Sequence, residues 1–438
     1  MEPSSSLRSK KPIKRSVKPP PLILTIEDLE KKKQEEKERN NDWNLDPDQY
    51  KLLKEHYGPI LKLAKYDGCY IPKDRDSDIC SMVYYLRWIF IGIVVALATY
   101  QTIYMFVFML FKEDYSAQAA LTVVELMWSF QSILSIFCTI YWRRRDFVSV
   151  IFQATHKVNK SVSLIKAKSW IYFVIMFGAV LVLAAVLYST LIVLSVVFKF
   201  NNYVVGESVL VYGRRLIPLH VVVFTFIYFS WVCCMGRFLA FTILVYYESE
   251  YCNQQLEEIG KTNGDIGDEL LKQYEKHCHL MKAVELLDRT FQVYVFFMIA
   301  SNIPATIFSL IAFFLNLKIS CYSALLALPS VIFCVITFVG LTAIPVKLRS
   351  SVIGAGRIVQ TNMKIWKPYD AKIYQIAQLF INHGKHNSLG ISVWSFADIS
   401  KPLVLTIASL TVSYLSFILG LKSQFGFDAN ACNSTSLS

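Results

Sequence analysis

Ionisable side chains inside long apolar stretches are the residues of this chain whose type and position could do chemistry. Glu125 lies near one end of such a stretch, and His220 and Arg237 lie in another. A charged group in hydrocarbon costs a few kcal/mol unless it faces protein or water. Glu125 and His220 are therefore candidates for polar contacts in a ligand pocket. The alternative is that each pairs with a neighbouring helix or extends to the lipid headgroups.

Enzyme chemistry finds little support in the sequence. His277, Cys278 and His279 form the one dense cluster of His and Cys. Consecutive residues on a helix point in different directions, so these side chains would not converge on one metal ion. The sequence has no GxSxG, HExxH or glycine-rich phosphate loop. We therefore expect no enzymatic activity, no catalytic residues, no metal and no cofactor.

Seven apolar stretches position these residues. The chain is 54% hydrophobic and 14% aromatic over 438 residues, which is too apolar for a soluble domain of that length. Each stretch can supply the roughly 20 helical residues that cross a bilayer, and none alternates like a barrel strand. The predicted fold class is all-α, a polytopic membrane protein with seven transmembrane helices. The predicted spans are 88–111, 119–142, 171–198, 216–247, 291–315, 321–346 and 402–421.

Lys and Arg accumulate on alternate loops, which predicts the orientation. The loops after the second, fourth and sixth spans are rich in them, while the other loops carry few. By the positive-inside rule the N-terminus is cytoplasmic and the C-terminus extracellular, in a multi-pass protein of the plasma membrane. The same distribution explains the net charge of +12 through membrane topology, so we expect lipids and not nucleic acid as partners.

The C-terminal tail agrees with this orientation. Asn433-Ser434-Thr435 is an N-glycosylation sequon, which is usable only on the luminal or extracellular side. A second sequon begins at Asn159, in a loop predicted to be cytoplasmic, so a sequon by itself has little weight.

Three regions follow from these patterns. Residues 1–87 form a cytoplasmic N-terminal region whose first part, rich in Pro and basic residues, is expected to be disordered. Residues 88–425 form the seven-span domain, and residues 426–438 an extracellular tail. Within the domain, apolar residues recur at helical spacing in 369–382 and 270–287. We expect these cytoplasmic segments to form a helical anchor.

The last span is rich in small and hydroxyl residues. They are Thr406, Ser409, Thr411, Ser413, Ser416 and Gly420, with Tyr414 among them. Such residues either allow close packing against another helix or line a water-filled path.

The order of these features resembles the invertebrate gustatory-receptor family. That family has seven spans with the N-terminus inside, and its last span ends in Thr-Tyr, five hydrophobic residues and Gln-Phe. Here Ser413-Tyr414 is followed by 415–423 and then by Gln424-Phe425, so Ser replaces Thr and the spacing is about one helical turn longer. The preceding segment 392–402 is also similar, and the divergent nematode branch is the nearest in character.

The resemblance implies a tetrameric, ligand-gated cation channel with a chemosensory, gustatory role. Each subunit would give its last helix to a central pore and its cytoplasmic helices to a shared anchor, in a homo- or hetero-tetramer. A small-molecule pocket would lie in the outer half of each subunit. The candidate pore or gate residues are Ser413, Tyr414, Leu421, Gln424 and Phe425.

Other functions remain open from the sequence. A metabotropic or neuromodulatory receptor-like protein would use the large basic loops, but the signatures of G-protein-coupled receptors are missing at the matching spans. A light or peroxide sensor of the same family is a further alternative. A seven-span membrane hydrolase needs a set of His and Asp ligands within the spans, and these spans contain almost no His.

Overall fold

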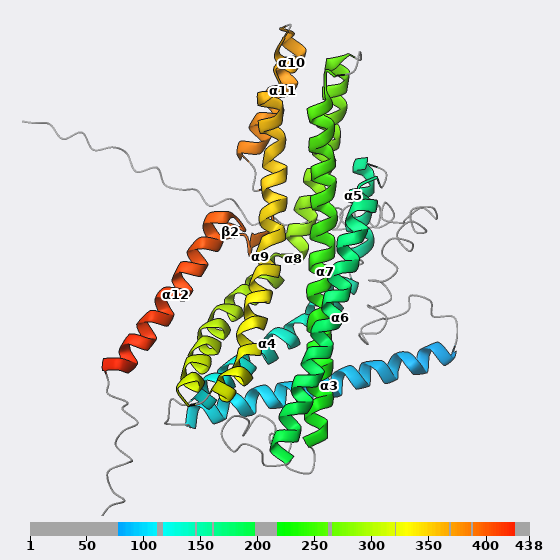
Figure 1. Ribbon diagram of the computed structural model, residues 1–438. Helices are drawn as coiled ribbons and strands as arrows, with labels where there is room; N and C mark the ends of the chain where they lie inside the picture. The colour runs from blue at the N-terminus through cyan, green and yellow to red at the C-terminus, as the bar shows by residue number, and fades with distance from the viewer. Residues whose placement is uncertain are drawn as a thin grey trace, which may run out of the picture. The chain divides into compact units, whose positions relative to one another are not determined.

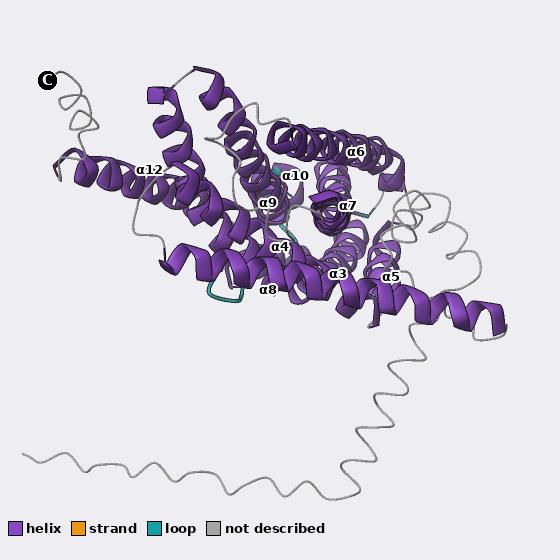
Figure 2. Ribbon diagram, turned by 90° about the horizontal axis from the view of Figure 1, so that it is seen from below, coloured by secondary structure: helices purple, strands orange, loops and turns teal. Residues whose placement is uncertain are grey.

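The chain is described here by a computed structural model, which is almost entirely helical (Figure 2). It describes residues 78–111, 117–144, 147–159, 162–197, 217–261, 265–319, 321–367, 369–386 and 389–424. The predictions for residues 1–77, for Phe425 and for the tail with Asn433 lie outside these ranges.

Seven of the described helices are long and apolar enough to cross a membrane, and the protein is a multi-pass membrane protein. This confirms the predicted fold class. Which side of the membrane each terminus occupies stays a prediction. The helices are α3 (Asp78–Phe111), α4 (Ala117–Arg144), α6 (Val162–Val197), α7 (Ile217–Glu258), α8 (Ile266–Ile319), α9 (Cys321–Thr361) and α12 (Lys401–Gln424).

Three of these helices are much longer than a bilayer requires. Helices α7, α8 and α9 have 42, 54 and 41 residues. At about 1.5 Å per residue, α8 extends roughly 80 Å, against about 30 Å of hydrocarbon. The sequence analysis predicted the apolar part of each helix as a span and residues 270–287 as a separate helical segment, and in the structure that segment is part of α8.

The ends of α7, α8 and α9 form a second core with α10 (Met363–Trp366) and α11 (Ala371–His386), which we call the anchor bundle (Figure 1). Helix α11 occupies the segment where the sequence predicted an amphipathic helix at 369–382. Its apolar face is buried against α8 and α9. The core of the anchor bundle contains Leu256, Ile259, Leu270, Ala355, Val359, Ile365, Ile376, Ala377 and Phe380.

Aromatic rings hold the central part of the helices together. Trp142 of α4 packs edge to face on Phe291 and Tyr294 of α8, with ring centroids 4.6 and 5.4 Å apart. Phe238 of α7 contacts Phe291 at 5.3 Å. The indole N–H of Trp142 donates to the carbonyl oxygen of Thr290 at 3.0 Å. Lipid tails are as apolar as these side chains, so close packing and hydrogen bonds hold the helices together.

One further helix and a hairpin of two strands complete the described part of the chain. Helix α5 (Phe147–Asn159) packs on α8. Strands β1 (Ser392–Val393) and β2 (Ala397–Asp398) pair antiparallel and form a hairpin between α11 and α12. The sequence analysis predicted neither α5 nor the hairpin. Strands of two residues leave no alternating pattern to detect.

Phe380 gives a test of the anchor bundle. It is fully buried and contacts the rings of Tyr274 and His277, both at 5.2 Å. We expect Phe380→Ala to destabilise the bundle by about 3–5 kcal/mol, because it leaves a cavity in a packed core. Hydrogen exchange should accelerate in α11 and in the facing end of α9. The adjacent Leu379 is exposed, so Leu379→Ala should change exchange little. Equal effects of both variants would contradict this packing.

Candidate functional site

One face of α12 packs against the rest of the chain. Val404 and Ile407 contact the central core. Leu415 and Ile418 pack on a cluster formed by α4 and α8, whose members are Ala120, Ile307, Ile311 and Ala312. These four residues of α12 recur at helical spacing, so they make a single contact stripe. Apart from the half-buried Leu403 and Thr411, the other residues of α12 whose exposure is described are exposed.

Five of the six small and hydroxyl residues noted in the sequence lie on the opposite face of α12, whereas Thr411 is half-buried on the side of the contact stripe. Thr406, Ser409, Ser413, Ser416 and Gly420 are alternately three and four residues apart, and all five are exposed. At about 100° per residue they form one stripe, on average nearly half a turn away from the contact stripe. We call it the small-residue stripe. Within a bilayer, such a face suits another helix at close range or water better than lipid.

The predicted pore or gate residues divide between two faces of α12. Ser413 belongs to the small-residue stripe, and helix rotation places the Gln424 position close to the same line. Tyr414 is exposed, about 100° from Ser413, beside the Leu421 position. Phe425 lies outside the described residues. The sequence analysis grouped these residues as one set, whereas the helix places Ser413 and the Gln424 position on one line and Tyr414 and the Leu421 position on another.

The hairpin that precedes α12 is bound tightly to α8. The carboxylate oxygen Oδ1 of Asp288 accepts from the backbone N–H of Ser392 at 2.6 Å and from its hydroxyl at 2.8 Å. Gln292, one turn later, accepts from the Ser395 hydroxyl at 2.6 Å and from the Trp394 N–H at 3.4 Å. Trp394 and Ser395 have φ of 46° and 59°. These hydrogen bonds support a turn that L-residues adopt at some cost.

Helix α9 holds the other strand of the hairpin. The guanidinium of Arg349 lies 3.4 Å from the carboxylate of Asp398. Gly390 lies so close to the stem of Arg349 that a Cβ there would come within 3.2 Å of it. The backbone carbonyl of Ser400 then accepts from Val404 at 3.0 Å in the first turn of α12. The start of α12 is therefore coupled to α8 and α9.

A column of aromatic rings runs down α7. His220 stacks on Phe224, Phe224 on Tyr228, and Tyr228 on Trp231, with centroids 6.1, 6.0 and 5.8 Å apart. Phe333 of α9 closes the column, 5.2 Å from Tyr228 and 4.8 Å from Trp231. Trp128 of α4 contacts Phe333 at 4.9 Å from another side. Three helices thus meet at Phe333.

A buried donor lies within this aromatic column. Trp231 is only 3% exposed, and its indole N–H has no hydrogen-bond partner among the described residues. Buried polar groups are nearly always paired, so an unpaired donor inside an aromatic cluster suits an acceptor atom of a ligand. The sequence analysis did not single out this column. The spacing of His220, Phe224, Tyr228 and Trp231 along one helical face was the signal that could have found it.

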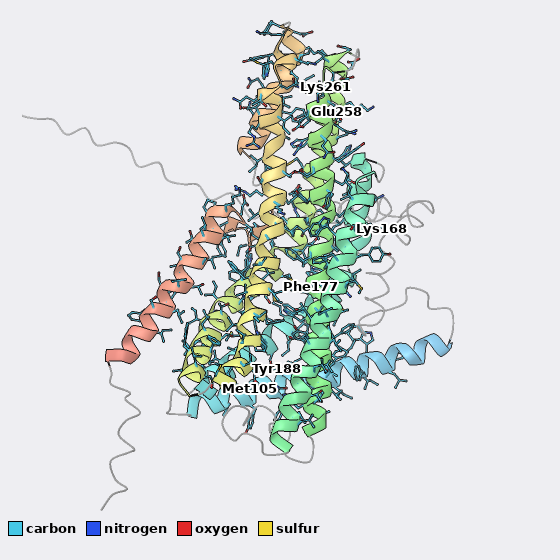
Figure 3. The ribbon with its side chains drawn as sticks, viewed as in Figure 1. Met105, Lys168, Phe177, Tyr188, Glu258 and Lys261 are labelled. Carbon is cyan, nitrogen blue, oxygen red and sulfur yellow. The ribbon has the colours of Figure 1, made fainter. Side chains whose placement is uncertain are left out.

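The two predicted pocket residues lie at the same end of their helices. His220 is buried in the first turn of α7 and begins the aromatic column. Glu125 is half-buried in α4 and lies near the phenol of Tyr188 in α6. Figure 3 shows Tyr188 and Met105 near one end of the helices and Glu258 and Lys261 at the other, in the anchor bundle. The polar candidates therefore lie far from the anchor bundle.

One residue of the His/Cys cluster, His277, is packed in the anchor bundle. His277 is buried, and its ring lies 5.2 Å from that of Phe380 in the anchor bundle. Within the described ranges, no group of three His, Cys, Asp or Glu residues is arranged to hold a metal ion.

Asp288 should control the hairpin's attachment. Asp288→Ala removes the acceptor of two hydrogen bonds, and we expect the hairpin to open more easily by about 2 kcal/mol, or roughly 30-fold. Hydrogen exchange at Ser392 should rise accordingly while the middle of α8 stays protected. Glu285→Ala is the matched control, because Glu285 lies one turn away in an exposed ion pair with Arg289. An unchanged exchange rate in Asp288→Ala would disprove the clamp.

Comparison with known proteins identifies the fold. No protein-family model and no curated protein matches the chain. The insect olfactory receptor OR5 from Machilis hrabei in complex with eugenol matches with a TM-score of 0.68 and 13% identity, over 85% of this chain and 99% of the receptor. A second structure of that receptor gives 0.65 and 14% with the same coverage. These neighbours are receptors and not enzymes. The chain therefore has the fold of an insect olfactory receptor.

Proposed function

We propose that this protein is a chemosensory receptor of the gustatory type that is itself a ligand-gated cation channel. In this proposal four subunits assemble with α12 of each lining a central pore. The observation that carries it is the small-residue stripe of α12, which is exposed on the face opposite the contact stripe. The likeness in fold to an olfactory receptor supports a sensory role.

The chemistry of the stripe suits a hydrated cation path. Ser and Thr hydroxyl oxygens can replace water around a cation, and small side chains leave room for the remaining hydration shell. Thr406 donates its hydroxyl hydrogen to the carbonyl oxygen of Pro402 at 2.9 Å, so an oxygen lone pair remains available to the path. Four copies of this stripe around one axis would shield these hydroxyls from lipid.

The aromatic column supports a small-molecule site at the end of the helices away from the anchor bundle. Phe333, Tyr228 and Trp231 offer ring faces, and the Trp231 N–H offers a donor. A small, mostly apolar ligand with one acceptor atom suits such a site. The olfactory receptor of similar fold was solved in complex with eugenol. Glu125 and His220 would add polar contacts nearby.

The hairpin provides a connection between the two sites. Phe333 is part of α9, which also carries Arg349, and Asp288 lies on α8. A shift of α8 or α9 on ligand binding would therefore move the hairpin and the start of α12. We propose this route for gating, with the anchor bundle holding the subunits together on the cytoplasmic side.

Ser413 gives a direct test of the pore. We expect Ser413→Leu to reduce agonist-evoked cation current about tenfold or more, because it removes a hydroxyl and adds bulk at four positions around the axis. Ala408→Leu is the matched control. Ala408 is exposed on the same helix, but it lies about 140° around from Ser413. Current should be recorded at equal surface expression. Equal loss in both variants, or no loss in Ser413→Leu, would argue against a pore along this stripe.

The orientation has its own test at Asn433. If the C-terminus is extracellular, the expressed protein should carry a glycan that peptide N-glycosidase removes, and Asn433→Gln should abolish the mobility shift. Asn159→Gln should leave the shift intact, because that sequon is predicted to be cytoplasmic. The plasma-membrane location is checked by surface biotinylation. A shift that depends on Asn159 instead would invert the proposed topology.

A further inference from the structure

The hairpin lies where three predicted spans meet the membrane boundary. The spans at 291–315 and 402–421 begin beside it, and the span at 321–346 ends beside it. Its hydrogen bonds and ion pair reach Asp288 and Arg349, both within one turn of these limits. Three helices therefore place the hairpin at the same depth, at one interface between hydrocarbon and water.

Five aromatic rings form a continuous surface from α4 across α8 to the tip of this hairpin. Phe130 contacts Phe297 at 6.1 Å, and Phe297 contacts Trp394 at 5.7 Å. Phe296 lies 4.9 Å from Trp394 and 6.2 Å from Phe396. We call these five residues the aromatic ridge. Because each ring contacts the next, the ridge is a single apolar surface and not a set of scattered side chains.

The tip of the aromatic ridge contains some of the most exposed apolar side chains among the described residues. Phe396 is 80% exposed, and Trp394 and Phe130 are exposed as well. The left-handed backbone at Trp394 and Ser395 makes the tight turn that presents both hairpin rings outward. The Asp288 and Gln292 hydrogen bonds fix that turn. A well-supported turn with apolar rings at its tip indicates a surface that meets an apolar partner.

A phospholipid leaflet is the partner that fits this surface best. The ridge is continuous with the exposed apolar side of α4, where Phe137 and Tyr141 follow Phe130. That side must face lipid or protein in a multi-pass protein. Trp at the boundary between hydrocarbon and headgroups is typical of membrane proteins. Arg289 and Lys401 are exposed at the same depth, where they can meet lipid phosphates.

We infer that the aromatic ridge inserts into one leaflet and anchors the hairpin at the boundary between headgroups and acyl chains. This inference does not depend on the channel function, because it needs only the spans and the ridge. Its consequence is that the depth of the hairpin, and with it the first turn of α12, is set by lipid as well as by protein. The lipid composition of this leaflet would then affect the position of α12.

Lipid quenching of a fluorophore at the hairpin tip tests this inference. Phe396→Cys is labelled with an environment-sensitive dye in the full-length protein, which is reconstituted in nanodiscs with and without nitroxide-labelled phosphatidylcholine. Tyr369→Cys is the matched control, because Tyr369 is 75% exposed but lies at the anchor bundle. Wild-type protein treated with the same dye gives the background from native cysteines. Quenching of the dye by aqueous iodide is measured in parallel.

We expect the dye at position 396 to be quenched by nitroxide lipid and protected from iodide, and the dye at position 369 to show the reverse. Quenching by iodide alone at position 396 would place the tip in water and overturn the inference. Protection of the dye from both quenchers, together with a disulfide between two copies of the unlabelled Phe396→Cys variant under oxidising conditions, would assign the ridge to a second copy and overturn it as well.

Tryptophan fluorescence is an independent measurement that tests the inference even if the labelled variant is recovered poorly. Tryptophan emission is quenched with brominated phosphatidylcholine in wild type and in Trp394→Phe, which keeps an aromatic ring in the ridge. Trp394 is one of eight tryptophans, so its contribution is measured by difference. The lipid-quenched part of the emission should fall in Trp394→Phe. If the lipid-quenched part of the tryptophan emission is the same in Trp394→Phe as in wild type, the inference is also overturned.

Discussion

Lipid offers no hydrogen-bond partner to a polypeptide backbone, and the organisation of this chain depends on that constraint. Each crossing must satisfy its own N–H and C=O groups, so every candidate span is a helix. The same solvent removes the hydrophobic drive between helices. Contact then depends on close ring packing, as at Trp142 and Phe291, and on bonds between helices such as Gln131 to Ser301 at 3.0 Å.

The membrane environment also gives meaning to two features of the described residues. The hairpin is non-helical, and it lies at a predicted membrane boundary with its backbone groups bound by Asp288, Gln292 and its own strand partners. Helix α12 is helical but packs along one stripe only, with hydroxyl groups on its far side. The exposed hydroxyl face of such a helix suits contact with further copies of the chain or with water, and the proposed channel supplies both.

Much of the architecture could be predicted from the sequence, because apolar length and loop charge are recorded locally. The spans and the amphipathic helix α11 follow from such patterns. The hairpin clamp could not be found in this way, since Asp288 and Ser392 are far apart in sequence and meet only in the fold. Glu125 and His220 stood out as polar residues among apolar ones. The aromatic column around Phe333 did not, because aromatic residues occur in every span.

A cryo-electron-microscopy reconstruction of the purified protein in nanodiscs tests the central claim most directly. It measures the number of subunits and the direction that each face of α12 takes. The account predicts four copies, with the stripe from Thr406 to Gly420 lining a common axis and the contact stripe turned toward α4 and α8. A monomer, or an assembly in which that stripe faces lipid, would contradict it.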